Sequence, residues 1–87
     1  MRVLVVGSGG VGSAFVAIAA TRQAFTHVTV ADLDFDKAEA AVASAGEASA
    51  GGRIVAAMLD ASSREAVTAL ANEMHANDIL NACDPRL

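Results

Sequence analysis

Apolar runs alternate with segments of helical periodicity along the whole chain. Four short runs, rich in β-branched and aliphatic residues, predict strands buried on both faces, because a parallel strand that is covered by helices on both sides needs no polar face. They cover residues 2–6, 27–31, 53–59 and 78–83. The second run ends at Asp32 and the third at Asp60.

Three helices are predicted between these runs, since apolar residues recur there at spacings of three and four. The first covers about residues 11–22, the second about 35–45, and the third runs to about His75. A capping box of Ser62 and Glu65 is expected to begin the third helix, and Gly46 to close the second. The residues expected to face inward are Val11, Phe15, Ile18 and Ala19, then Ala38, Ala41, Val42 and Ala45, then Val67, Leu70, Ala71 and Met74.

The order of these elements predicts the topology. Strands that alternate with helices of this length must be parallel, because each crossover needs the helix. Right-handed crossovers then predict a four-stranded parallel sheet of order 3-2-1-4 between two helical layers. The predicted fold class is α/β, a Rossmann-like three-layer α/β/α arrangement that is incomplete, with residues 1–87 forming one domain.

Composition narrows the partners. The chain is 54% hydrophobic and carries a net charge of −4, with its basic residues scattered. These features indicate a folded domain and argue against nucleic acid or an anionic membrane as a partner. The single cysteine, Cys83, cannot form an internal disulfide, so nothing indicates secretion and a cytoplasmic protein is expected.

The uncharged segment 3–21 follows Arg2 and also fits a signal peptide. Four glycines interrupt it, however, and a glycine inside a helix costs about 1 kcal/mol. A tight turn between a strand and a helix explains these glycines better than a continuous apolar helix does.

Residues 7–12 form the pattern G-x-G-x-x-G at that turn. The pattern is weak alone, but a preceding strand and a following helix are the context in which it binds a dinucleotide. Gly7 then allows the turn, Gly9 lets the backbone approach a pyrophosphate, and Gly12 lets the helix pack on the strand. The amides at the helix start face the phosphates. A purely structural turn is the alternative. The residues concerned are Gly7, Ser8, Gly9, Gly10, Val11 and Gly12.

Asp32 lies 20 residues after Gly12, at the end of the second predicted strand. A carboxylate at that place accepts hydrogen bonds from the adenosine ribose and repels a 2′-phosphate. Leu33 follows, where an NADP-binding protein more often has a basic or hydroxyl residue. NAD is therefore the expected cofactor, with NADP less favoured. The alternative is that Asp32 only begins the next helix, although Asp34 or Asp36 also fits that role.

Two further sites lie at strand ends. Asp60-Ala61 follows the third strand, near the expected adenine, and also fits a solvated loop. Asn81-Ala82 ends the fourth strand, beside the crevice where the strand order reverses, and Asn81 fits either a ligand contact or a backbone contact. No metal site and no catalytic residue is predicted: His27 and His75 are expected at the surface, and Cys83 as a small buried residue.

The blocks VLVVGSGGVG at 3–12 and VTVADLD at 28–34 resemble the N-terminal cofactor-binding domain of the saccharopine dehydrogenase family. LDASS at 59–63 and ILNACDP at 79–85 extend the resemblance over essentially the whole chain. The resemblance implies an NAD(P)-dependent oxidoreductase acting on an amine–carbonyl couple. It also implies that the glycine motif holds pyrophosphate, Asp32 and Leu33 the ribose, Asp60 and Ala61 the adenine, and Asn81 and Ala82 the middle of the cofactor.

Relatives that use NADP have a basic residue near position 33, and Leu33 departs from that pattern. Members of the family continue for hundreds of residues, so the 87 residues are expected to be a fragment without the substrate domain and without activity of its own. The alternative function is a non-enzymatic nucleotide sensor like the regulatory domains of potassium channels. Because Ile79 and Leu80 lie on an open edge strand, self-association as a dimer through that edge is expected.

Overall fold

The computed structural model describes residues 1–7, 10–22, 25–46 and 52–81, with only the backbone described for residues 10–13 and 20. Its strands are β1 (Arg2–Val6), β2 (His27–Asp32), β3 (Ile54–Met58) and β4 (Asp78–Asn81). Its helices are α1 (Gly10–Ala20), α2 (Phe35–Ala43) and α4 (Arg64–Glu73).

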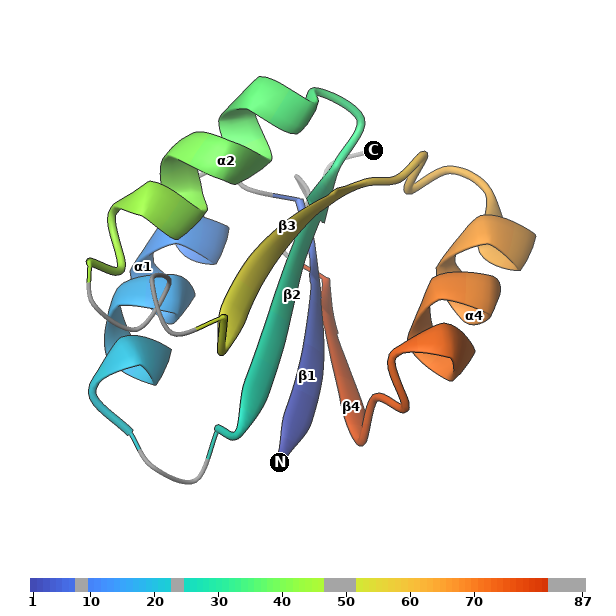
Figure 1. The fold of residues 1–87 in the computed structure, drawn as a ribbon. Coiled ribbons are helices and arrows are strands. Elements are labelled where there is room, and N and C mark those ends of the chain that lie inside the picture. The colour runs from blue at the N-terminus through green and yellow to red at the C-terminus, as the bar shows by residue number, and fades with distance from the viewer. Residues whose placement is uncertain (8–9, 23–24, 47–51, 82–87) are drawn as a thin grey trace.

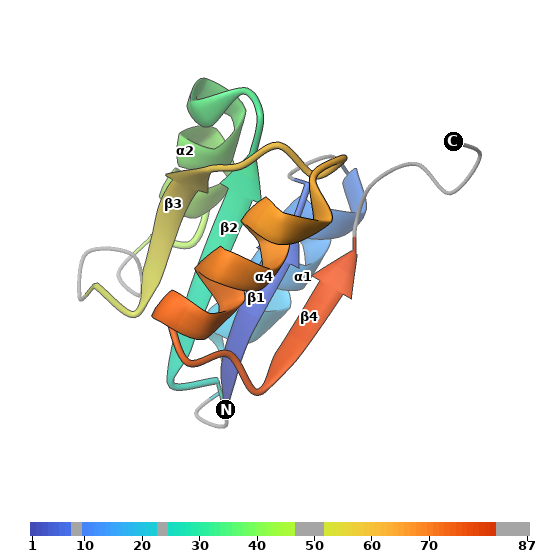
Figure 2. The ribbon, with the colours of Figure 1, turned by 90° about the vertical axis from the view of Figure 1, so that its right-hand side faces the viewer.

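The four strands form one parallel sheet of order β3-β2-β1-β4, which confirms the predicted topology. Helices α1 and α2 cover one face of the sheet and α4 covers the other (Figure 1). The molecule therefore has three layers, and all four strands end at the same edge of the sheet. The loops that follow β2 and β3 both lie at this carboxyl edge (Figure 2).

Alternating side chains of β1 supply the core on both faces of the sheet. Val3 and Val5 pack with the residues of α1 and α2, whereas Leu4 and Val6 pack with Met74 on the side of α4. Both faces are buried, which explains why the strand is a continuous apolar run. Burying each such side chain contributes about 1.5–3 kcal/mol, so β1 is the centre of the fold in energy as well as in position.

The inner face of α1 differs from the prediction. Val16 and Ala19 are fully buried, and Phe15 contacts Phe25 edge to face with ring centroids 5.3 Å apart. Ile18, predicted to face inward, is 54% exposed. The physical reason is that α1 is apolar on all sides, so the pattern alone does not select the buried face. The side chain of Val11 lies outside the described residues. The inward faces of α2 and α4 are confirmed.

The ends of several other elements differ from the predicted ends by one or two residues. Helix α2 ends at Ala43, not near residue 45, and a turn follows in which the Gly46 N–H donates to the Ala43 carbonyl at 3.2 Å. Gly46 has a φ of 64°, which glycine adopts without strain. Strand β3 covers 54–58 instead of 53–59, and residues 82 and 83 of the fourth predicted strand lie outside the described residues. No helix in the described ranges has the length and apolar character to cross a membrane.

The predicted capping box of Ser62 and Glu65 is wrong by one residue. Ser63 is the N-cap of α4, and its hydroxyl accepts a hydrogen bond from the Ala66 N–H at 3.2 Å. The Ser62 hydroxyl instead donates to Asp60 Oδ1 at 2.6 Å. Asp60 forms a turn that takes Ser62 as its partner, and the helix therefore begins one residue later.

Arg53 lies at the edge of the sheet where the strands begin, and it connects β3 to the end of α1 and to the segment before β2. Its guanidinium Nη1 donates to the carbonyls of Arg22 at 2.9 Å and Phe25 at 2.8 Å, and more weakly to that of Ala19 at 3.4 Å. These carbonyls lie at the end of α1 and in the segment before β2. A cation at a helix carboxyl end also interacts favourably with the helix dipole.

Arg53→Met is expected to lower the free energy of unfolding by about 1–2 kcal/mol, because it removes charge-assisted hydrogen bonds to partly buried carbonyls. The midpoint of urea unfolding, followed by circular dichroism, measures this loss. Arg22→Met is the control, since it removes the same charge from an exposed side chain and keeps the Arg22 carbonyl. Equal losses in the two variants would show that the Arg53 hydrogen bonds contribute nothing.

Candidate functional site

The chain leaves β1 through Gly7, which has a φ of 94°. This region is accessible to glycine and strained for residues with a Cβ. The Gly7 N–H donates to the Ala31 carbonyl on β2 at 2.7 Å, so the turn is fixed against the neighbouring strand. Helix α1 then begins at Gly10. The predicted order of strand, glycine turn and helix is confirmed.

The amino end of α1 has no acidic residue in its first turn. No acidic side chain of the first turn therefore neutralises the positive end of the helix dipole, which suits an anion. Gly10, Val11 and Gly12 provide this first turn, and their side-chain surroundings are not described. Ser8 and Gly9, both predicted to contact pyrophosphate, lie outside the described residues.

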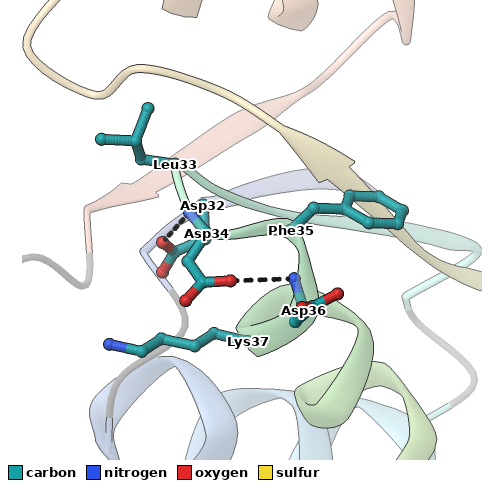
Figure 3. Close-up of a pocket in the computed structure, with 6 residues that line it drawn as sticks. All are labelled: Asp32, Leu33, Asp34, Phe35, Asp36 and Lys37. Atoms are coloured by element: carbon teal, nitrogen blue, oxygen red, sulfur yellow. Dashed lines mark hydrogen bonds between the residues drawn. The ribbon is translucent and has the colours of Figure 1, made fainter.

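Asp32 is the last residue of β2 and pairs in register with Met58 of β3. Its Oδ1 accepts a hydrogen bond from the Asp34 N–H at 2.9 Å, which holds the loop after the strand in a tight turn. Asp34 in turn caps α2, where its Oδ1 accepts from the Asp36 N–H at 3.1 Å (Figure 3). The N-cap of α2 is therefore Asp34. Asp32 does not begin the helix, which was the structural alternative to a role in ribose binding.

Asp60 follows β3 and is held by Ser62. Its Oδ1 accepts from the Ser62 N–H at 2.9 Å and from the Ser62 hydroxyl at 2.6 Å. These two hydrogen bonds, the hydroxyl contribution first, lower the pKa of Asp60 below its ordinary value. Asp60 is therefore a carboxylate at neutral pH, with its orientation set by the turn.

One pocket of about 180 Å³ brings five of the twelve predicted site residues together. Whole-ligand pockets usually measure about 300–1,000 Å³, so this one suits a portion of a dinucleotide. These five residues come from the ends of three strands, which are 25 to 30 positions apart in the chain. Ser62, which the sequence predicts only as a helix cap, also lines the pocket. The lining residues are Gly7, Asp32, Leu33, Asp60, Ala61 and Ser62.

Asn81 lies in a second, neighbouring pocket of about 350 Å³. It pairs in register with Val6, and Ala61 and Ser62 border both pockets. Asn81 is thus beside the first site and not in it. Arg64 and Thr68 of α4 also line this pocket and were not anticipated. Ala82 lies outside the described residues.

The histidines are remote from this edge. His27 begins β2 at the opposite edge of the sheet, and its Nε2 lies 3.2 Å from the Thr29 hydroxyl oxygen. Burial lowers the pKa of His27, and the nearby Arg2 lowers it further. Among the described residues, no three His, Cys, Asp or Glu side chains gather closely enough to hold a metal ion.

Ser62→Ala is expected to raise the pKa of Asp60 toward its ordinary value, because it removes the shorter hydrogen bond to the carboxylate. The pH dependence of the Asp60 carboxyl carbon signal in NMR measures the change. Ser63→Ala is the matched control: it removes the helix cap and lowers the free energy of unfolding by about 1 kcal/mol, yet leaves the Asp60 pKa in place. An unchanged Asp60 pKa in Ser62→Ala would contradict the assignment.

Comparison with known families gives one match. The model of the saccharopine dehydrogenase NADP-binding domain matches residues 3–83. No curated protein matches the chain. The matched family is of dehydrogenase type and binds a nicotinamide dinucleotide, which supports the oxidoreductase reading over a sensor. Its description names NADP and gives no preference for NAD. Because the match spans nearly the whole length, this chain belongs to the saccharopine dehydrogenase NADP-binding domain family.

Proposed function

We propose that the domain binds NAD in preference to NADP, as the cofactor-binding part of an oxidoreductase that acts on an amine–carbonyl couple. The observation that carries this proposal is the pocket in which Gly7, Asp32, Leu33, Asp60 and Ala61 meet. The adenosine diphosphate has three portions, pyrophosphate, ribose and adenine, and this chain has residues that suit each of them.

The pyrophosphate is bound at the amino end of α1. Gly7 turns the chain with a positive φ, and no acidic side chain in the first turn opposes the phosphate charge. Backbone amides at a helix start suit this anion because they point along the helix axis and need no reorientation. This contact does not distinguish NAD from NADP.

The ribose is bound by Asp32, whose carboxylate lies at the pocket that Gly7 also lines. Adenine lies between Leu33 and Ala61, which provide apolar surface, with the Asp60 carboxylate as an acceptor for the exocyclic amine. Leu33 is 68% exposed without a ligand, so covering it with a flat ring also removes apolar surface from water.

The preference for NAD rests on charge. Asp32, Asp34 and Asp36 all line the open cavity at the start of α2, against one cation, Lys37. A 2′-phosphate bound there meets a net negative surface. The ribose hydroxyls of NAD have no such charge, and the same carboxylates accept hydrogen bonds from them.

The bound nicotinamide ring supplies hydride transfer, and this domain positions it. Asn81, which lines the second pocket, contacts the middle of the cofactor in this proposal. We assign a catalytic acid or base to none of the described residues. The domain's own task is to hold and orient the dinucleotide.

Asp32→Ala is expected to weaken NAD binding about tenfold, the effect of losing charged hydrogen bonds to the ribose, and to weaken NADP binding less. Calorimetric titration of both dinucleotides measures the two changes. Asp78→Asn, which removes an acid at the opposite edge of the sheet, is the control and leaves both affinities unchanged. Equal losses of NAD and NADP affinity in Asp32→Ala would remove the proposed role.

Self-association through β4 is a separate proposal. Among the described strands β4 lies at the edge of the sheet, and Ile79 is 45% exposed, so this edge is the proposed place for pairing with a second copy. Ile79→Lys is expected to shift a dimer toward monomer in analytical ultracentrifugation. Met58→Lys, on the other edge strand, is the control and leaves the dimer intact. A wild-type chain that stays monomeric at high concentration would contradict this proposal.

A further inference from the structure

Lys37 is the single lysine of the chain and lies in the first turn of α2. It lines an open cavity of about 600 Å³ together with the residues that link β2 to α2. In Figure 3 its side chain extends on the same side as the carboxylates of Asp32 and Asp34, whereas Leu33 and Phe35 point in other directions. The ammonium group thus shares a space with the carboxylate proposed to bind ribose.

The position of Lys37 relative to the proposed ribose site suits one ligand group, a phosphate on the 2′ oxygen. Asp32 is proposed to accept hydrogen bonds from the ribose hydroxyls, so a substituent on the 2′ oxygen extends into the segment that follows Asp32. The cavity along that segment is lined by residues 32–37, and Lys37 is the cation among them. An ammonium group is a compact, strong partner for a phosphate dianion.

The amino end of α2 is the other positive feature near Lys37, and two carboxylates already offset its charge. The amino end of α2 carries Asp34 as its cap and Asp36 in its first turn, and Asp34 accepts the Asp36 N–H. These two carboxylates offset the helix dipole where a phosphate would approach. Attraction for a 2′-phosphate therefore depends on the Lys37 side chain, and Asp34 opposes it.

We propose that Lys37 is the residue that admits the 2′-phosphate of NADP to this site, and that Asp34 limits that admission. The inference rests on the proposed placement of the adenosine ribose at Asp32. NADP binding is then a balance between one ammonium group and the adjoining carboxylates. The chain accepts both dinucleotides, and a single charge change moves the ratio of their affinities.

The test uses the 87-residue chain and two probes that differ by the 2′-phosphate, 5′-AMP and 2′,5′-ADP, together with NAD and NADP. Lys37→Met is expected to lower the affinities for 2′,5′-ADP and NADP about tenfold, and to leave those for 5′-AMP and NAD within about twofold. Lys37→Arg is expected to retain 2′,5′-ADP binding. Asp34→Asn, which keeps a good helix cap, is expected to raise the affinity for 2′,5′-ADP several-fold.

Arg22→Met is the matched control, because it removes one positive charge from an exposed residue just beyond the far end of α1. A general charge effect would make this variant behave like Lys37→Met and would overturn the proposal. Unchanged 2′,5′-ADP binding in Lys37→Met, or equal losses for both probes, would also overturn it while the proposed function stands. If the wild-type chain binds neither 5′-AMP nor NAD, the proposed function itself fails.

Discussion

The site depends on one backbone constraint, the sharp exit of the chain from β1 at Gly7. The N–H of Gly7 is bonded to the Ala31 carbonyl, and its φ of 94° is a backbone conformation that glycine adopts without strain. Helix α1 begins at Gly10, four residues after the last residue of β1, and its amino end lies at the carboxyl edge of the sheet. The register of the parallel sheet then brings Asp32, Asp60 and Asn81 to the same edge.

Charge at this edge is divided between two neighbouring helices. The start of α1 carries no acidic residue, whereas the start of α2 carries Asp34 and Asp36. An anion is therefore favoured at one helix and disfavoured at the other, although both helices lie on the same face of the sheet (Figure 1). This asymmetry distinguishes the diphosphate, which every dinucleotide has, from a phosphate on the ribose. The family description names NADP, and we propose that the residues between Asp32 and Lys37 set the preference of this chain between NAD and NADP.

The sequence alone predicted what depends on periodicity and on strand ends. The sheet order, the strand–turn–helix context of the glycines and the meeting of Gly7, Asp32, Asp60 and Ala61 followed from the alternation of elements. The buried face of α1 did not, because a helix apolar on all sides hides which of Val16 and Ile18 faces the sheet. The start of α4 was misplaced because two adjacent serines compete for one cap, and the choice is made by Asp60, which lies two residues before Ser62 and takes its hydroxyl as a hydrogen-bond donor within the same turn.

The interaction of Arg53 with the end of α1 bears on the entropy of ligand capture. Helix α1 is packed on the sheet through the buried side chains of Val16 and Ala19, and Arg53 adds hydrogen bonds at its carboxyl end. The hydrogen bonds from Arg53 to the carbonyls of Ala19 and Arg22 and the packing of Val16 together orient the helix axis within the fold. Ordering that is completed during folding does not have to be repeated on association. A side chain at the far edge of the sheet thus contributes to preorganisation of a phosphate site it never touches.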